Sequence, residues 1–296
     1  MRFVVTGREG QVVRALLERA SGRDVEVLPL GRPVLDLAGP ADAIVSVIER
    51  DNPDVVVSAA AYTHVDKAES EPALVFSVNE QGPAALARAA SALGIPLIHL
   101  STDYVFDGSK VSGYREEDAT DPSGVYGASK LAGEQAVLKE HENTAVLRTA
   151  WVYSPFGSNF VKTMLRLARD RDEVSVVCDQ HGNPTNALDI ADGIFEVAAN
   201  LKAGGDPSHR GLFHMTGTGE ASWAEFAEAI FAESAALGGP TARVRRISTA
   251  DYPTAAKRPE NSRLDSTKLA HLHGVRLPEW RSSLKGVVNR LIRASV

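Results

Sequence analysis

Residues 2–11 read RFVVTGREGQ, and this stretch decides the fold. Its apolar first half predicts a strand over 2–6, and the segment 11–20 that follows has the pattern of a helix. Between them, Gly7 lets the chain turn tightly off the strand, and Gly10 lets main-chain N–H groups approach a pyrophosphate at the helix N-terminus. Such turns also occur without a ligand, but a strand, a glycine turn and a helix in this order favour a dinucleotide-binding unit.

The rest of the first half repeats this alternation of short apolar runs and helical patterns. Further strands are expected at 25–30, 55–58, 96–101 and 145–149, and further helices at 41–51 and 72–93. Strands that are apolar throughout and separated by helices indicate a parallel sheet covered on both faces. Right-handed crossovers between them give an α/β fold, a doubly wound parallel sheet of the Rossmann-like kind.

Beyond about residue 150 the alternation loosens, and segments rich in Gly, Pro and Asp appear at 204–210 and 238–241. We therefore expect a dinucleotide-binding domain over 1–150 and a smaller C-terminal α/β lobe over 151–296 that mainly binds substrate. Within the second part, residues 187–216 are expected to pack back on the first domain.

The composition narrows the classes of partner. The chain has 296 residues, 44% of them hydrophobic, and a formal net charge of −6, which argues against nucleic acid or an anionic membrane as the main partner. The single cysteine, Cys178, allows no internal disulfide, which fits a reducing compartment. No apolar run approaches the ~20 residues that span a bilayer, and no secretory pattern follows Arg2, so a cytoplasmic protein is expected.

The ends of the second and third strands suggest how a dinucleotide would be held. Arg32 stands near the place where an acidic residue usually grips the ribose of NAD, and it could accept a 2′-phosphate, which favours NADPH. The alternative is a solvated arginine in a turn. Asp36 and Leu37 could border the adenine, and the small side chains of 59–61 would let a flat ligand lie close to the backbone, although helix–sheet packing explains three alanines equally well.

A second group of residues carries the candidate chemistry. Thr102 ends the fourth strand, at the edge of the sheet where ligands bind in open α/β folds. Tyr126 and Lys130 are four residues apart, so on a helix they share a face. A nearby cation is expected to lower the pKa of the Tyr126 phenol, making it a proton donor to a carbonyl that receives hydride, with Thr102 bonded to the same oxygen. Alone, the spacing would equally describe a surface pair.

With these residues assembled, the sequence resembles the extended short-chain dehydrogenase/reductase superfamily, and within it the dTDP-4-dehydrorhamnose reductase family. The resemblance covers nearly the whole chain. Its carriers are Gly7-x-x-Gly10-Gln11, Ala59-Ala60-Ala61-Tyr62-Thr63, Val65-Asp66-Lys67, Ser101-Thr102-Asp103-Tyr104-Val105-Phe106, Tyr126-Gly127-x-x-Lys130, Arg148-Thr149-x-Trp151, Asp179-Gln180-x-Gly182-x-Pro184-Thr185 and Arg258-Pro259-x-Asn261-Ser262.

The resemblance implies reduction of the 4-keto group of dTDP-4-dehydro-L-rhamnose to dTDP-L-rhamnose, with hydride from NADPH or alternatively NADH. It implies that Thr102, Tyr126 and Lys130 are catalytic and that Lys130 also holds the nicotinamide ribose. The expected cofactor-binding residues are Gly7, Gly10, Gln11, Val12, Arg32, Asp36, Leu37, Ala59, Ala60, Ala61, Tyr62 and Lys130. The expected substrate-binding residues are Val65, Thr102, Asp103, Tyr104, Tyr126, Trp151, Arg258 and Arg263, although Trp151 could be a core residue and the two arginines could be surface charges.

Two positions depart from the family pattern. Val13 stands where the loop usually has a third glycine, so we expect the first helix to be pushed outward or repacked, at some cost in cofactor affinity. Some relatives form a metal-bridged dimer through an acidic residue of the first helix, but Ala15 occupies that place here, so no metal is expected. A monomer or a homodimer remains open. So do two other functions, a related sugar-nucleotide reductase or epimerase and a non-catalytic nucleotide-binding regulator.

Overall fold

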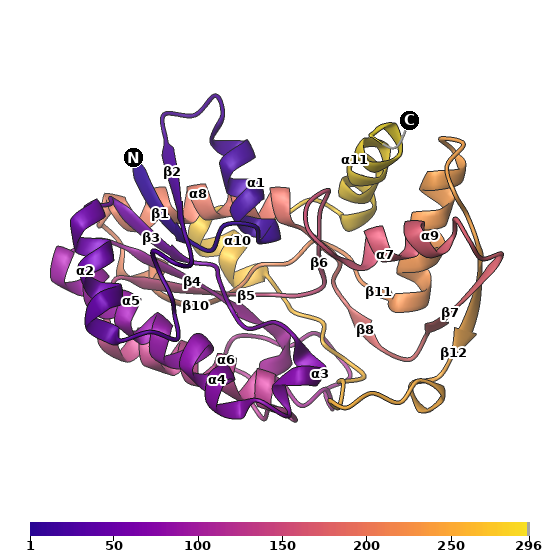
Figure 1. The fold of residues 1–296 in the computed structure, drawn as a ribbon, viewed down its shortest axis with the longest axis horizontal. Coiled ribbons are helices and arrows are strands. Elements are labelled where there is room, and N and C mark those ends of the chain that lie inside the picture. The colour runs from indigo at the N-terminus through magenta and orange to yellow at the C-terminus, as the bar shows by residue number, and fades with distance from the viewer. Residues whose placement is uncertain (295–296) are drawn as a thin grey trace.

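The computed structural model describes residues 1–294 and is built around a six-stranded sheet (Figure 1). Its strand order is β10-β5-β4-β3-β1-β2, and every neighbouring pair is parallel. The strands are β1 (Arg2–Thr6), β2 (Glu26–Leu30), β3 (Val55–Ser58), β4 (Leu97–Thr102), β5 (Thr144–Thr149) and β10 (Gly211–His214). The expected bounds of the first five agree to within one residue.

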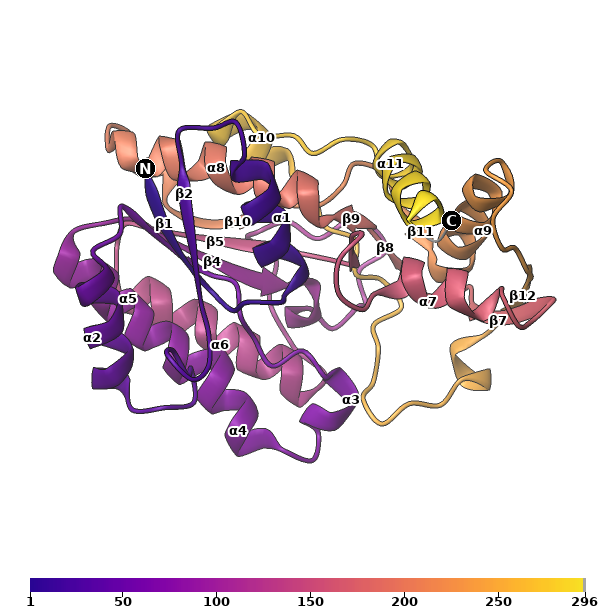
Figure 2. The same ribbon diagram turned by 45° about the horizontal axis from the view of Figure 1, so that its top comes forward.

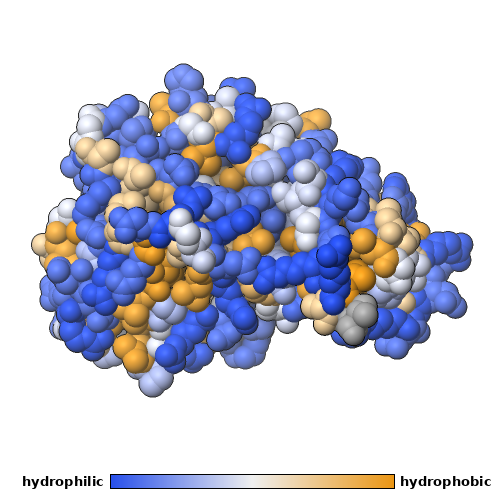
Figure 3. Space-filling model, turned by 90° about the horizontal axis from the view of Figure 1, so that it is seen from above, coloured by the Kyte–Doolittle hydropathy of each residue, from blue (hydrophilic) through white to orange (hydrophobic). Residues whose placement is uncertain are grey.

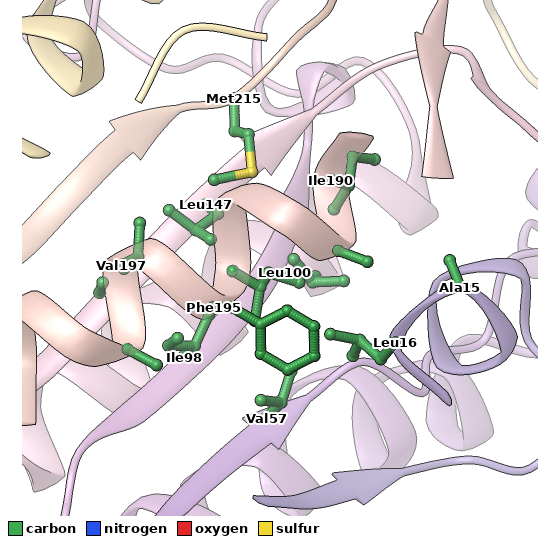
Figure 4. Close-up of a cluster of buried hydrophobic side chains, with 14 of the residues drawn as sticks. Ala15, Leu16, Val57, Ile98, Leu100, Leu147, Ile190, Phe195, Val197 and Met215 are labelled. Carbon is green, nitrogen blue, oxygen red and sulfur yellow. The ribbon is translucent and has the colours of Figure 1, made fainter. Parts of the chain in front are cut away.

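Helices cover both faces of this sheet, as Figure 2 shows. One face carries α2 (Ala41–Asp51), α5 (Gly82–Leu93) and α6 (Val125–Glu140), whose apolar side chains pack on Val4, Val56 and Val146. The other carries α1 (Gln11–Ala20) and α8 (Ala187–Ala203). Figure 4 shows Phe195 of α8 pointing toward Leu16 of α1 and Val57 of β3. Because consecutive residues of a strand point to opposite faces, both of which are covered by helices, β3, β4 and β5 are buried along their whole length.

The segment expected to be one helix over 72–93 is helical, but its middle is a π-helical turn rather than a regular α-helix. It consists of α4 (Pro72–Phe76), a π-helical segment (Ser77–Gln81) and α5. Pro83 has no N–H to offer the carbonyl of Asn79 four residues earlier, so the regular hydrogen-bond pattern cannot continue there. The wider turn places the fully buried Asn79 side chain against the main chain of Tyr62 and the hydroxyl of Ser129.

The second lobe has its own core. Helices α7 (Phe160–Leu167), α9 (Trp223–Ala235) and α11 (Trp280–Arg293) pack with the parallel pair β7 (Glu173–Val177) and β12 (Arg243–Ile247). Two short pairs link the lobe internally and to the sheet edge: β6 (Val152–Tyr153) with β9 (Thr185–Asn186), and β8 (His181–Gly182) with β11 (Ala221–Ser222). The chain also returns to the first lobe, where α8 packs on α1 and β10 pairs with β5; α10 (Thr267–His273) lies beside β10.

The surface is mixed in character. Seen from above, it is mostly hydrophilic, with separate hydrophobic areas between the charged side chains (Figure 3). Among the described residues, no helix combines the length and apolar character needed to cross a membrane.

Candidate active site

The turn after β1 forms the floor of a cleft at the carboxyl edge of the sheet. Gly7 has a φ of 98°, a left-handed conformation that favours glycine, and its N–H donates to Leu30 at 2.6 Å. A Cβ on Gly7 would lie 3.4 Å from both Ala60 and Val13. Gly10 precedes α1 with no side chain to cap the helix, so the first main-chain N–H groups are left for a ligand.

Two adjoining cavities extend from this turn. The first, of about 680 Å³, runs along the ends of β1 and β2, and the second, of about 450 Å³, runs toward α6 and the second lobe. They share Gly7, Ala60, Ala61 and Thr63. Every cofactor-binding residue predicted from the sequence lines one of the two: Gly7, Arg32, Asp36, Leu37, Ala60, Ala61 and Tyr62 the first, and Gly10, Gln11, Val12, Ala59 and Lys130 the second.

Gln11 also ties the two lobes together. Its side-chain amide donates to Val152 at 3.1 Å and accepts from Ser154 at 2.7 Å and from Asn159 at 2.9 Å. All three partners belong to the segment that opens the second lobe. The glycine turn is therefore fixed against the lobe expected to hold the substrate.

Two arginines lie at the far end of the first cavity. The guanidinium of Arg8 contacts the main-chain oxygen of Arg32 at 3.5 Å, and both side chains are exposed. Within residues 1–294, neither forms an ion pair with a carboxylate; Asp36 uses its carboxylate to accept from the N–H of Ala38 at 3.0 Å. The sequence drew attention to Arg32 but not to Arg8, whose only signal was its place directly after Gly7.

Thr102 lies where β4 ends and a single 3-10 turn (Asp103–Val105) begins. Its hydroxyl donates to the Asp103 carboxylate at 2.9 Å and accepts from the N–H of Tyr104 at 3.3 Å. Burial raises the pKa of Asp103 to about 6, against hydrogen bonds from Ser262 and Thr102 that lower it. The second carboxylate oxygen of Asp103 is buried without a partner among the described residues.

Tyr126 lies in the first turn of α6, next to Thr102. Its neighbour Gly127 makes this possible, because a Cβ there would lie only 2.2 Å from the main-chain oxygen of Tyr104. The rings of Tyr104 and Tyr126 meet edge to face with their centroids 5.6 Å apart. Burial raises the pKa of Tyr126 to about 12, while the hydrogen bond with Thr102 lowers it and the charge of Asp103 raises it.

Lys130 follows one turn later, as the spacing predicts, but its effect on Tyr126 is not the expected one. Its amino group donates to Leu100 at 2.7 Å and lies 3.4 Å from a ring nitrogen of His99. Burial lowers the pKa of Lys130 to about 8. The prediction that Lys130 makes the Tyr126 phenol more acidic is therefore wrong for the protein alone, since the cation is turned toward the sheet and burial of the phenol dominates.

The predicted substrate residues fall into two groups. Val65 begins α3 (Val65–Ala68), and beside it Asp66 pairs with Arg258 at 2.9 Å, bringing the C-terminal part of the chain to the cleft. Arg258 lies close enough to Tyr104 to lower the pKa of its phenol, although burial raises that pKa overall. Arg263 is instead held by Glu220 at 2.9 Å, by Asn261 at 2.8 Å and by the main-chain oxygen of Val111.

Trp151 marks the passage from β5 into the second lobe. Its φ is 49°, a strained conformation for a non-glycine residue. Its ring stacks on Trp223 with centroids 3.6 Å apart, and a Cβ on Gly182 would lie 2.4 Å from it. One face of the indole is therefore covered by another tryptophan, and its substrate role stays a prediction.

The departures of the first helix are absorbed by repacking. Val13 is 1% exposed and lies in the core between α1 and the sheet, so the valine fills the space that a glycine would leave. Ala15 is fully buried in the same cluster. Among residues 1–294, no three His, Cys, Asp or Glu side chains are grouped so that they could hold a metal ion.

The comparison with known families shows the family of this chain. Residues 1–293 match the family described as RmlD substrate binding domain. The chain belongs to this RmlD family. This membership confirms the resemblance found in the sequence, and it covers both lobes rather than the dinucleotide-binding half alone.

Relatives within the RmlD family match along their whole length. The dTDP-4-dehydrorhamnose reductase of Sinorhizobium fredii is 51% identical over 292 residues, covering 99% of this chain and 98% of that protein. The enzyme of the same name from Aggregatibacter actinomycetemcomitans is 43% identical, covering 97% and 98%.

Solved structures of this family confirm the doubly wound fold. A dTDP-4-dehydrorhamnose reductase from Clostridium acetobutylicum superposes with a TM-score of 0.91 at 36% identity, covering 98% of this chain and 99% of that one. The Bacillus anthracis enzyme, solved in complex with NADP, gives 0.89 at 34% identity with the same coverage.

Two residues of the cleft belong to the motifs of the resemblance but were not predicted from the sequence as site residues. The hydroxyls of Ser101 and Thr149 are buried without a partner among the described residues, and both residues line the second cavity with Tyr126 and Lys130. They end neighbouring strands, so only the strand order could have brought them together.

Proposed function

We propose that this protein reduces the 4-keto group of dTDP-4-dehydro-L-rhamnose to dTDP-L-rhamnose. The observation that carries the proposal is the grouping of Thr102, Tyr126 and Lys130 around one end of a dinucleotide cleft, in a chain of the RmlD family. A phenol that is protonated at neutral pH, beside a hydroxyl and a lysine, suits a carbonyl oxygen that must gain a proton.

The cleft fits an NADP-type cofactor. Gly7 has the left-handed conformation that favours glycine, and the start of α1 offers uncapped N–H groups. Two arginines that form no ion pair within residues 1–294 lie at the far end of the cavity. Gly7, Gly10, Gln11 and Val12 would hold the pyrophosphate, and Arg32 with Arg8 would take the 2′-phosphate of NADPH. Asp36, Leu37 and Tyr62 would border the adenosine, 59–61 would lie along the dinucleotide, and Lys130 would hold the nicotinamide ribose. When bound, NADPH supplies the hydride.

Tyr126 then gives its phenolic proton to the sugar oxygen as negative charge develops there. Thr102, whose single O–H donates to Asp103 in the protein alone, would turn that O–H to the same sugar oxygen and stabilise the charge before the proton arrives. The phenolate left behind is stabilised by the ammonium of Lys130, which is largely protonated at neutral pH with a pKa of about 8. The raised pKa of Tyr126 keeps its proton in place until the oxygen becomes strongly basic.

The substrate would lie between the lobes, on the side of the cleft where Val65, Asp103 and Tyr104 approach Tyr126. Arg258 is suited to a sugar-nucleotide phosphate, because within residues 1–294 its guanidinium pairs with a single carboxylate, that of Asp66, through Nη2. Trp151 is stacked on Trp223, so it would offer the substrate only the edge of its indole. Arg263 is paired with Glu220, so it would offer the substrate a single N–H. We infer that the protein is cytoplasmic and is a monomer or a homodimer. Its binding partner is the small nucleotide sugar that it reduces.

The test is turnover of purified protein with NADPH and dTDP-4-dehydro-L-rhamnose, followed by the loss of NADPH absorbance. We expect NADPH oxidation that depends on the sugar nucleotide. Oxidation with a different nucleotide sugar only would point to a related reductase or epimerase. NADPH binding without turnover of any nucleotide sugar would point to the non-catalytic regulator.

A further inference from the structure

The amino group of Lys130 is held by two atoms of β4 beneath the second cavity. It donates to the main-chain oxygen of Leu100 at 2.7 Å and lies 3.4 Å from Nε2 of His99. Lys130 is 3% exposed but lines the cavity. An ammonium has three N–H donors, so two contacts with β4 leave one N–H for a ligand or for Tyr126.

The carboxylate of Glu134 does not bind the Lys130 amino group, because it is already paired. Glu134, one turn further along α6, accepts two hydrogen bonds from Arg148 of β5, at 2.8 Å and 2.7 Å. This pair is almost completely buried. Glu134 therefore influences the charge of Lys130 only from a distance, and His99 is the side chain that contacts the amino group from the sheet.

His99 is fully buried and in the right protonation state to accept a hydrogen bond. Burial, and next the charge of Lys130, hold the pKa of His99 well below its ordinary value, so the ring is neutral. Its Nδ1 lies 3.0 Å from the hydroxyl of Ser58 on β3. With the proton on Nδ1 donated to Ser58, the lone pair of Nε2 faces Lys130.

We propose that His99 is a positioning residue for the reduction: its neutral Nε2 holds the Lys130 amino group so that one N–H remains directed into the cavity. The inference rests on the proposed function of Lys130. Because the Lys130 ammonium can only donate, Nε2 must accept and Nδ1 carries the proton, for which Ser58 is the acceptor. Three neighbouring elements, β3, β4 and α6, therefore determine where the lysine points.

Two substitutions separate the two nitrogens of the ring. His99→Gln places an amide near the position of Nε2 and keeps a partner for Lys130. His99→Asn reaches only the position of Nδ1 and keeps the contact with Ser58. A hydrogen bond to a charged group is typically lost at a cost of on the order of tenfold in an equilibrium constant, so we expect the Kd for NADPH to rise roughly tenfold in His99→Asn and less than about threefold in His99→Gln.

The pH dependence of NADPH binding supplies a second readout. The titratable and charged groups around Lys130 are His99 of β4, which contacts its amino group, Tyr126 of α6, which lines the same cavity, and Glu134 of α6, which acts at a distance and is paired with Arg148 of β5. Removing the acceptor disfavours the ammonium, so binding should weaken at a pH about one unit lower in His99→Asn than in the native protein. In His99→Gln the midpoint should stay where it is.

His141→Asn is the matched control. His141 is also buried, with its Nε2 on the main-chain oxygen of Ile95 at 2.8 Å, but it lies at the end of α6 away from both cavities. Its substitution should lower thermal stability and leave NADPH binding unchanged. If His99→Asn does not fold, Ser58→Ala tests the same point, because it leaves the Nδ1–H of His99 without its acceptor, disfavours the tautomer whose Nε2 accepts from Lys130, and should raise the Kd roughly threefold.

Equal Kd values and pH midpoints for His99→Gln and His99→Asn would overturn the proposal, as would an unchanged Kd in both or, in the fallback, in Ser58→Ala. Because the readout is NADPH binding, it is independent of the sugar substrate. Native protein that binds NADPH but turns over no nucleotide sugar would defeat the proposed function while leaving this result interpretable.

Discussion

The amino group of Lys130 donates a 2.7 Å hydrogen bond to the main-chain oxygen of Leu100, which joins the catalytic helix to the strand that ends in Thr102. This contact fixes the distance between α6 and β4 at the level of the cleft. It also turns the cation toward the sheet rather than toward the phenol, and the pKa of Tyr126 is raised to about 12 rather than lowered. Tyr126 is thus a donor that holds its proton firmly and releases it only to a strong base.

Tyr126→Phe should abolish reduction and leave NADPH affinity nearly unchanged. The substitution removes the phenolic proton and keeps the ring in edge-to-face contact with Tyr104. Loss of a general acid typically costs about 10²–10⁴-fold in rate. Single-turnover rates and a fluorescence titration with NADPH measure the two effects separately. Turnover within a few fold of the native rate would show that another group supplies the proton.

The charge of Lys130 should limit activity on the alkaline side. Burial lowers its pKa to about 8, so the ammonium is present below that pH and is lost as the pH rises through it. We expect kcat/KM to fall above about pH 8, and Lys130→Met to lower both NADPH affinity and rate at every pH. A pH profile of the variant that retains the same alkaline limb would assign that limb to a different group.

Asp103 should make the protein less stable as the pH rises through about 6. Burial raises the pKa of Asp103 from 3.8 to about 6 in the folded protein. The resulting stabilisation is complete at a pH below the pKa of the unfolded chain, and it is lost as the pH rises through the pKa of the folded protein. In Asp103→Asn this dependence disappears. The difference in unfolding free energy between the two proteins should change by on the order of 3 kcal/mol between pH 3 and pH 8, because each pKa unit corresponds to about 1.4 kcal/mol.

Urea unfolding at several pH values measures that change. Asp189→Asn is a positive control, because burial also raises the pKa of this carboxyl outside the cleft, so its difference from native protein should change with pH in the same direction. If the difference in unfolding free energy between native protein and Asp103→Asn does not vary with pH, burial does not raise the pKa of the Asp103 carboxyl.

Val13→Gly should destabilise the protein without tightening NADPH binding. From the sequence alone, restoring the glycine of the family loop was expected to improve affinity. In the structure Val13 is 1% exposed and fills the core beneath α1, so its removal leaves a cavity and adds a glycine to a helix. Together these cost about 2–4 kcal/mol. A lower Kd for NADPH in the variant would show that the valine strains the turn.

The sequence predicted the sheet and the cleft because both depend on local patterns. Apolar runs define β1 to β5, and Gly7 with Gly10 marks the turn. What the sequence could not supply depends on contacts between distant segments. Arg8 and Arg32 meet only because β1 and β2 are neighbours, and Ser101 and Thr149 only because β4 and β5 are. The pKa of Tyr126 depends on where the Lys130 side chain turns, which helical spacing does not determine.

Arg8 and Arg32 should together set the preference for NADPH over NADH. Both residues follow the ends of β1 and β2, the guanidinium of Arg8 donates to the main-chain oxygen of Arg32 at 3.5 Å, and within residues 1–294 neither side chain forms an ion pair with a carboxylate. A hydrogen bond to a charged group contributes about 1.5–3 kcal/mol, so Arg8→Ala and Arg32→Ala should each raise the Kd for NADPH roughly tenfold. The Kd for NADH, which lacks the 2′-phosphate, should change less than about twofold. Arg14→Ala is the control, because Arg14 is also exposed and lies nearby on α1, but pairs with Glu9 at 3.4 Å. Equal weakening for both cofactors would place the two arginines against the pyrophosphate or the adenine instead of the 2′-phosphate.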